Sequence, residues 1–333
     1  MTIGKFIINK FVPFLVWIAG AKKGSWEEKK YTVVLQSLIM TPVKRLKGIR
    51  RVSKSVEQQY DGISGLYIKD NYYEGRMRYS VVDGEVKHIS SIENMQFIRQ
   101  EMNEVLKSIQ FNNVLEVGVG ELTTLESIYD NFGPDIEAYG LDLSVNRIYH
   151  GLKEYRKRHK LVPTVVKGNA IRLPFPDNSF DLVYTRHTLE QMPTIYKEAL
   201  DEIIRVSKRH VILFEPSYEL ASMSQRIKMH NSDYVRGIMG FLKNRSDILI
   251  NSFYLMKNSA NPMNHTSCSK LELINPFVAE RAPVPFVCPQ SKSPLIKKDG
   301  YYFSETSSRA YPIIEGIPVL DYDYSVGITE PDL

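Results

Sequence analysis

The sequence predicts an α/β protein in which a parallel sheet carries helices on both faces. Its composition, with 43% hydrophobic and 24% charged residues, is typical of a folded chain. Strand and helix patterns alternate from about residue 93 to residue 214, as in folds built from βαβ units. The two cysteines, Cys268 and Cys288, are too few for a disulfide framework or a four-thiolate zinc site. We therefore expect a reducing, intracellular setting. The length of 333 residues is enough for two domains or for one large domain with extensions.

The periodicity of the apolar residues predicts each element of this sheet. Helical spacing predicts a first helix at 93–109. Short apolar runs predict strands at 112–118, 136–141, 164–166, 180–185 and 210–214, and the segments between them predict helices at 122–131, 145–158 and 195–207. In such units the loops that follow the strands meet at one edge of the sheet, where ligands bind.

A basic head precedes this region. Residues 1–54 contain twelve Lys or Arg and two Glu, a net charge of +10, which leaves −5 for the rest of the chain. The uncharged run at 11–21 lies between lysines and is too short to span a membrane. Three interpretations stay open: packing on the body or a partner, binding to an anionic membrane surface, or a cleaved signal peptide. In the membrane interpretation one helical face carries Phe6, Ile7, Phe11, Phe14, Leu15 and Ile18.

The first motif with chemical meaning reads V-L-E-V-G-V-G-E-L-T-T at 114–124. Gly118 and Gly120 let the backbone turn sharply and approach a ligand. A dinucleotide fingerprint would need a third glycine where Thr123 stands, which argues against a nicotinamide or flavin enzyme. The alternative is a tight βα turn without a ligand.

A second motif, Y-G-L-D-L-S at 139–144, places Asp142 at the end of the second strand. A carboxylate there can accept hydrogen bonds from both hydroxyls of a ribose. The alternative is that Asp142 or Ser144 caps the following helix.

A third stretch, G-N-A-I-R-L-P-F-P-D-N-S-F-D-L-V, begins at Gly168. In this order and spacing the three motifs resemble the class I S-adenosylmethionine-dependent methyltransferases, most closely the type 11-like subgroup that methylates small molecules, quinones, sterols and sugars. The resemblance covers about residues 90–278. It implies S-adenosylmethionine as the cosubstrate and a Rossmann-like sheet of seven strands. The last two strands, at 248–256 and 269–274, would form a reversed hairpin.

The resemblance also implies which residues bind the cosubstrate. Glu116, Gly118 and Gly120 would hold the methionine end, and Asp142 the ribose. Leu143 would pack on the adenine, Asn169 and Ala170 would lie beside the adenine amino group, and Arg186 would line the methyl-transfer region. Two departures from the family pattern are Leu122, in place of a third glycine, and Gln191, in place of a common histidine.

Methyl transfer is an in-line displacement that depends on positioning and the exclusion of water, so no metal is expected. His187, Glu190 and Glu215 are candidates for a general base by their position. The alternative is that they have structural roles, His187 in the wall of the pocket and Glu190 as an acidic residue that the helix dipole favours at the start of a helix. Tyr72, Tyr73 and Arg76 lie in a segment, 71–79, where this family often has a lid, and the alternative there is surface packing.

Residues 282–325 contain C-P-Q-S-K-S-P-L and A-Y-P-I-I-E-G-I-P-V-L. These pieces resemble the small zinc-ribbon-like proteins that activate tRNA and protein methyltransferases. Zinc-binding members have cysteines where this chain has Ser291, Ser304 and Ser307, so we expect a metal-free β module held by apolar packing. It would be a built-in counterpart of the activators, and the alternative is a stabilising tail.

These observations divide the chain into a basic amphipathic extension (1–55), a lid or connector (56–90), a methyltransferase domain (91–278) and the C-terminal module (282–325). The leading hypothesis is methyl transfer to a small-molecule, saccharide or lipid-linked acceptor, in the cytoplasm and peripherally at the membrane face. An RNA methyltransferase is the first alternative, although T-R-H-T at 185–188 differs from the N-P-P-Y-type tetrad of enzymes that methylate exocyclic base nitrogens. A non-catalytic scaffold that binds S-adenosylmethionine is the second.

Overall fold

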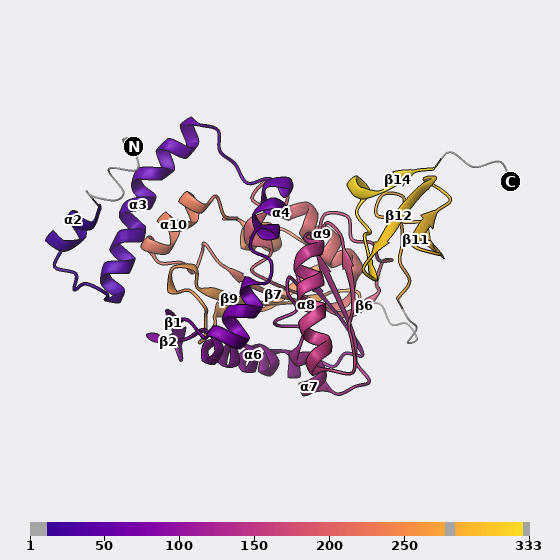
Figure 1. The fold of residues 1–333 in the computed structure, drawn as a ribbon, viewed down its shortest axis with the longest axis horizontal. Coiled ribbons are helices and arrows are strands. Elements are labelled where there is room, and N and C mark those ends of the chain that lie inside the picture. The colour runs from indigo at the N-terminus through magenta and orange to yellow at the C-terminus, as the bar shows by residue number, and fades with distance from the viewer. Residues whose placement is uncertain (1–11, 277–283, 329–333) are drawn as a thin grey trace.

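The computed structural model describes residues 12–276 and 284–328. At its centre lies a seven-stranded sheet of order β5-β4-β3-β6-β7-β9-β8 (Figure 1). Strand β9 runs antiparallel to both β7 and β8, and the other neighbours are parallel. The predicted sheet with a reversed final hairpin is therefore confirmed. The strands are β3 (Asn113–Val117), β4 (Glu137–Asp142), β5 (Thr164–Lys167), β6 (Phe180–Arg186), β7 (Ser207–Pro216), β8 (Ile248–Leu255) and β9 (Thr266–Leu273).

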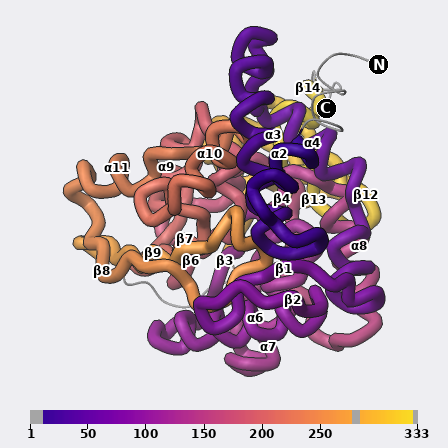
Figure 2. The backbone as a smooth tube through the Cα atoms, turned by 90° about the vertical axis from the view of Figure 1, so that its left-hand side faces the viewer, coloured from indigo at the N-terminus to yellow at the C-terminus, as the bar shows by residue number. Residues whose placement is uncertain are grey.

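Helices cover both faces of the sheet. Successive residues of a strand point to opposite faces, and apolar residues occupy both sets of positions. Val114 of β3 belongs to the core beneath α6, α7 and α8, and its neighbour Leu115 belongs to the core beneath α9 and α11. Figures 1 and 2 both show α6 and α7 along the lower side of the molecule. The helices are α6 (Ser91–Lys107), α7 (Ser127–Phe132), α8 (Val145–Arg158), α9 (Tyr196–Val206), α10 (Met223–Ser232) and α11 (Ile238–Lys243).

The helix predicted at 122–131 is wrong in its first half. Residues 120–126 form turns, and α7 begins only at Ser127. Leu122 has a φ of +59°, in the left-handed region, and a helix cannot continue through that conformation. The side chain of Leu122 is buried beneath the sheet, so apolar burial offsets the local backbone cost.

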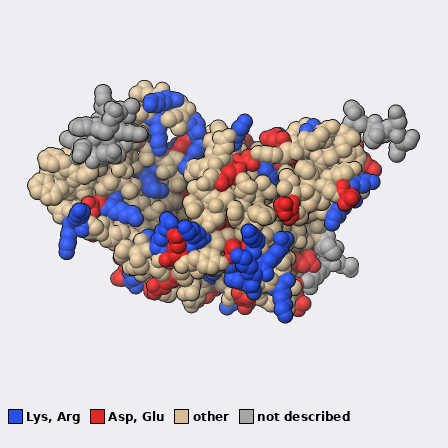
Figure 3. Space-filling view, viewed as in Figure 1, with Lys and Arg blue, Asp and Glu red and all other residues tan. Residues whose placement is uncertain are grey.

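The N-terminal region consists of helices and one hairpin. Its elements are α2 (Val12–Ile18), α3 (Trp26–Leu46), α4 (Ser53–Asp61), α5 (Leu66–Ile68), the π-helix η2 (Lys69–Glu74), β1 (Met77–Val82) and β2 (Glu85–Ser90). Helix α3 packs against α10, where Lys44 Nζ donates to the carbonyl of Asn231 at 2.8 Å. Basic side chains lie along α3 in Figure 3. Phe6, Ile7 and Phe11 of the predicted apolar face lie outside the described residues. Within the described ranges no helix is long and apolar enough to cross a membrane.

The C-terminal module is a small antiparallel sheet at the opposite end of the molecule from α2 and α3 (Figure 1). It contains β10 (Ile296–Lys298), β11 (Tyr301–Ser304), β12 (Arg309–Ile314), β13 (Ile317–Pro318) and β14 (Val326–Gly327). Tyr311 and Leu320 are fully buried in the core beneath α9, and Cys288 lies among Ser291, Ser307 and Tyr311. The Leu320 N–H donates to the carbonyl of Lys167 at 2.8 Å, so the module docks on the edge strand β5.

Candidate functional site

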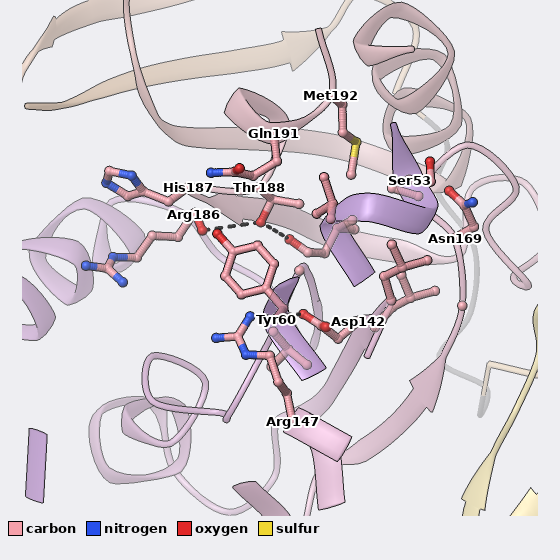
Figure 4. A pocket seen from close by; sticks show the side chains of 18 of the residues that line it. Ser53, Tyr60, Asp142, Arg147, Asn169, Arg186, His187, Thr188, Gln191 and Met192 are labelled. Atoms are coloured by element: carbon pink, nitrogen blue, oxygen red, sulfur yellow. Dashed lines mark hydrogen bonds and ion pairs between the residues drawn. The ribbon is translucent and has the colours of Figure 1, made fainter. Parts of the chain in front are cut away.

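A pocket opens at the carboxyl ends of β3, β4 and β6, where the strand order reverses direction. This switch point is the place where open α/β sheets bind ligands. Its empty volume is about 1050 Å³, including the part open to solvent. Five segments line it: residues 51–67, the loop after β3, the turn after β4, the turn after β5, and residues 186–195 after β6 (Figure 4).

The loop after β3 requires glycine at two positions. Gly118 has a φ of +82°, and a Cβ built on it would lie 1.9 Å from the hydroxyl of Thr188. Gly120 has a φ of +53°, and a Cβ there would lie 2.4 Å from the guanidinium of Arg147. The backbone of this loop therefore approaches its neighbours more closely than any residue with a side chain would allow.

Asp142, the last residue of β4, joins this loop to the start of α8. Its Oδ2 accepts a hydrogen bond from the Gly120 N–H at 2.8 Å, and its Oδ1 accepts one from the Ser144 N–H at 2.9 Å. The helix cap is confirmed for Ser144, which accepts the N–H of Arg147 at the start of α8, and Asp142 lines the pocket. The carboxylate can still accept further donors, because each oxygen has a second lone pair.

The sequence did not indicate the role of Arg147. Its guanidinium lies 3.9 Å from Asp142 and 3.8 Å from Glu121, between the rings of Tyr60 and Tyr67. Glu121 also accepts hydrogen bonds from the N–H groups of Gly65 and Ile68, at 3.0 and 2.8 Å. These contacts fix residues 60–68 over the pocket. Only the three-dimensional structure could reveal the contacts that hold residues 60–68, since these join positions more than 50 residues apart.

At the far side of the pocket from Arg186, Asn169 and Ala170 follow the short strand β5 (Figure 4). The Asn169 side-chain oxygen accepts a hydrogen bond from the Ile171 N–H at 3.3 Å. Ala170 is buried, and Leu143 also lines the pocket. The structure thus brings the three residues expected near an adenine to one pocket.

Glu116 and Arg186 also line the pocket. Burial raises the pKa of Glu116 to about 7, although Thr124 and Tyr184 donate hydrogen bonds to its two oxygens. Burial also lowers the pKa of Arg186, the last residue of β6. Its guanidinium points away from Asp142 and Asn169 in Figure 4.

His187 lines the pocket, but both of its ring nitrogens have partners. Nε2 lies 2.8 Å from the hydroxyl of Thr266, and Nδ1 lies 3.4 Å from Glu190 Oε1. Its backbone has a φ of +53°. In Figure 4 its ring extends to the same side as Arg186, away from Asn169.

Glu190 and Glu215 are buried behind this wall and do not line the pocket. Glu190 accepts hydrogen bonds from Gln191 at 2.8 Å and Asn264 at 2.7 Å. Burial opposes its ionisation, but the nearby His187 and Asn264 hold the pKa of Glu190 below its usual value.

Glu215 accepts the N–H groups of Thr188, Leu189 and Glu190, at 2.9 to 3.2 Å, and the Thr185 hydroxyl at 2.8 Å. Burial, together with the neighbouring Glu190, raises the pKa of Glu215. These bonds give Glu215 a clear role in holding the turn after β6.

The predicted lid at 71–79 lies elsewhere. Tyr72 contacts Glu126 and Arg99 on the surface of α6 and α7, and Tyr73 donates to Glu154 of α8 at 2.6 Å. Arg76 pairs with Glu74 at 2.7 Å. None of the three lines the pocket, so surface packing is the correct interpretation. The pocket is covered instead by residues 51–67, which sequence reasoning assigned to the end of the basic head and the connector.

Comparison with known proteins agrees with this geometry. A family described as "Methyltransferase domain" matches residues 115–214. Residues 115–214 carry a methyltransferase domain. The demethylmenaquinone methyltransferase of Anoxybacillus flavithermus is 38% identical over 94 residues, which cover 28% of this chain and 39% of that protein. The demethylmenaquinone methyltransferase of Listeria welshimeri is 33% identical over 110 residues, which cover 33% of this chain and 46% of that protein. The chain thus spans less than half the length of these curated relatives.

Two solved structures are similar to this chain in fold, over more of the chain than residues 115–214. Magnesium protoporphyrin IX methyltransferase from Synechocystis PCC 6803, with bound SAH, superposes with a TM-score of 0.51 at 11% identity. The alignment covers 67% of this chain and all of that one. The cyclase SpnF superposes with a TM-score of 0.52 at 14% identity over 68% of this chain and 97% of its own. The fold is therefore that of S-adenosylmethionine-dependent methyltransferases.

Gly118→Ala tests whether cosubstrate binding depends on the close approach of the Gly118 backbone to Thr188. The new methyl group would displace Thr188, so we expect S-adenosylhomocysteine binding to weaken at least about tenfold, a factor that corresponds to 1.4 kcal/mol. Isothermal titration calorimetry measures this affinity. Gly84→Ala is the matched control, because its φ is also +82° and no atom lies within 4 Å of the added Cβ. Equal affinities in both variants would contradict the expectation.

Proposed function

We propose that the whole chain is an S-adenosylmethionine-dependent methyltransferase whose acceptor is a small lipid-linked molecule of the quinone type. The observation that carries the proposal is the joint placement of Asp142 and the glycine turn at one pocket. The acceptor class is supported by the similarity to demethylmenaquinone methyltransferases across the central part of the chain.

Within this proposal each end of the pocket binds one part of the cosubstrate. Glu116, Gly118 and Gly120 hold the methionine end, and Asp142 holds the ribose hydroxyls. Leu143, Asn169 and Ala170 surround the adenine, whose amino group donates to the Asn169 oxygen. Residues 51–67 exclude water from the reacting atoms.

The reaction transfers the methyl group in line from the sulfonium to the acceptor. The bond between sulfur and the methyl carbon breaks, and sulfur keeps the electron pair. The bond between the acceptor and the methyl carbon forms, and an acceptor that carries a proton must release it. We assign His187 as the general base, because it lines the pocket while Glu190 faces its Nδ1. Such a carboxylate holds the imidazole so that Nε2 can take the proton. In this assignment Nε2 exchanges the Thr266 hydroxyl for the acceptor.

A lipid-linked acceptor requires access to a membrane surface, and the N-terminal helices offer one. Phe14, Trp17 and Ile18 on α2 are 53%, 72% and 60% exposed, and Lys22 and Lys23 follow directly. Aromatic and apolar side chains beside lysines are typical of helices that lie in the membrane interface. We propose that α2 and α3 place the pocket at an anionic membrane surface.

The first experiment is calorimetric binding of S-adenosylmethionine and S-adenosylhomocysteine to the full chain. We expect both to bind, and Asp142→Ala to weaken both at least about tenfold, because the variant loses the ribose hydrogen bonds and the support of the Gly120 and Ser144 N–H groups. Asp299→Ala, in an exposed turn, is the control. Methyl transfer to demethylated quinones in vesicles then tests the acceptor. Absence of binding by the folded wild-type chain would refute the proposal, and binding without transfer to any acceptor would favour a scaffold.

Trp17→Ser tests the membrane surface. Burying this side chain in the interface contributes about 1.5–3 kcal/mol, so its loss should weaken partitioning at least about tenfold. Sedimentation with vesicles of phosphatidylcholine and phosphatidylglycerol measures the partitioning. Leu249→Ser is the control, because Leu249 is 53% exposed but lies on β8, away from α2. Equal partitioning of the two variants would exclude α2 as the contact.

A further inference from the structure

Arg186 is a half-buried arginine of the pocket wall that has no short contact with a carboxylate of the described residues. Its Nε is inaccessible to solvent and has no hydrogen-bond partner. No carboxylate of the described residues lies within 4.0 Å of its guanidinium. Arginine stays protonated at neutral pH even when it is buried. A buried charge without a partner is costly, which points to a ligand that supplies the missing anion.

The nearest acidic groups face other donors. Glu116 accepts from Thr124 and Tyr184, and Glu215 accepts from the turn after β6. Both carboxylates interact with Arg186 only at longer range. The guanidinium is therefore free to form short hydrogen bonds with a molecule in the pocket that it lines.

We propose that Arg186 binds a carboxylate, and that this carboxylate belongs to the methionine end of the cosubstrate. The inference rests on the proposed function and deepens it. That end of S-adenosylmethionine carries both an ammonium and a carboxylate group. Glu116 and Arg186 both line the pocket and interact with each other at longer range, and the Arg186 guanidinium points away from Asn169 in Figure 4. A planar guanidinium binds a carboxylate through two parallel hydrogen bonds, which fixes the orientation of the ligand as well as its affinity.

A ligand without the carboxylate separates this role from a structural one. We would compare Arg186→Met with wild type in calorimetric binding of S-adenosylhomocysteine and of its decarboxylated analogue. We expect the variant to bind S-adenosylhomocysteine about 10- to 100-fold more weakly. The analogue should bind to both proteins alike. Arg172→Met, at an exposed arginine near the pocket, is the control.

The stability of the ligand-free protein gives a second readout. Because the charge of Arg186 is unpaired without ligand, Arg186→Met should unfold in urea at the same or a higher denaturant concentration than wild type. Equal losses for both ligands would overturn the proposal. So would unchanged binding of S-adenosylhomocysteine with a lower kcat/KM for the acceptor, which would assign the anion to the acceptor. If wild type binds neither ligand, the proposed function itself fails.

A second inference concerns the C-terminal module and rests on a different buried charge. Lys167, at the end of β5, is almost fully buried, and its Nζ contacts the carboxylate of Asp321 in the module. Its Nζ also lies 3.5 Å from Glu57 of α4 and 3.6 Å from the centre of the Tyr324 ring. The Tyr324 hydroxyl donates to Glu57 at 2.8 Å. One ammonium group thus joins the sheet, the module and α4.

Helix α4 forms part of the pocket wall, through Ser53, Val56 and Tyr60. We infer that the module positions this wall through Lys167, and that it thereby contributes to cosubstrate binding without touching the ligand. A lysine suits this place because its ammonium has three N–H donors that point in different directions, toward the carboxylates of Glu57 and Asp321 and the ring of Tyr324.

Asp321→Asn tests this coupling. Removing one partner of a buried charge loosens the others, so we expect S-adenosylhomocysteine affinity to fall by about five- to tenfold, at the lower end of the usual range for coupled sites. Asp323→Asn, at an exposed residue of the same turn, is the matched control. In a Lys167→Met background Asp321→Asn should cause no further loss. A lower unfolding midpoint with unchanged affinity would show that the contact only stabilises the module, and would overturn the inference.

Discussion

The carboxylate of Asp142 is the constraint on which the pocket depends. It holds the N–H of Gly120 on one side and that of Ser144 on the other, so one side chain fixes both the loop after β3 and the start of α8. Arg147 follows in the first turn of α8, and it can therefore lie over the glycine loop. The rings of Tyr60 and Tyr67 then stack on its guanidinium. The wall of the pocket is thus built outward from a single acidic residue.

The charged groups of the site divide into two kinds. Glu190 and Glu215 are saturated by hydrogen bonds from the protein and hold the turn after β6 in place. Glu116 and Arg186 lie at the pocket itself, and burial shifts the pKa of each toward its neutral form. Buried polar groups whose hydrogen bonds are all made within the protein give rigidity. Buried groups whose charged form is destabilised by burial mark a place for a ligand.

The sequence was sufficient to predict the sheet and the base of the pocket, because both depend on local patterns. Apolar runs predicted the first five strands of the sheet, and the family resemblance implied the last two. The glycine and aspartate motifs lie where strands end. The predicted helix at 122–131 failed because Leu122 adopts a left-handed conformation that its residue type does not indicate. The cover of the pocket was misplaced for a different reason. Tyr60 and Arg147 meet only through tertiary packing, and no periodicity or spacing reports that contact.

The way in which the C-terminal module meets β5 also affects how the sheet can associate with other chains. Strand edges with unpaired N–H and C=O groups are sites of edge-to-edge aggregation. Here Val319 and Leu320 pair with Lys167, so the β5 edge is shielded along the part nearest the pocket. The other edge is β8, which has no further strand beside it in the described part of the chain and exposes Leu249, Tyr254 and Leu255. A strand added at β8 would therefore extend the sheet on the side away from the pocket.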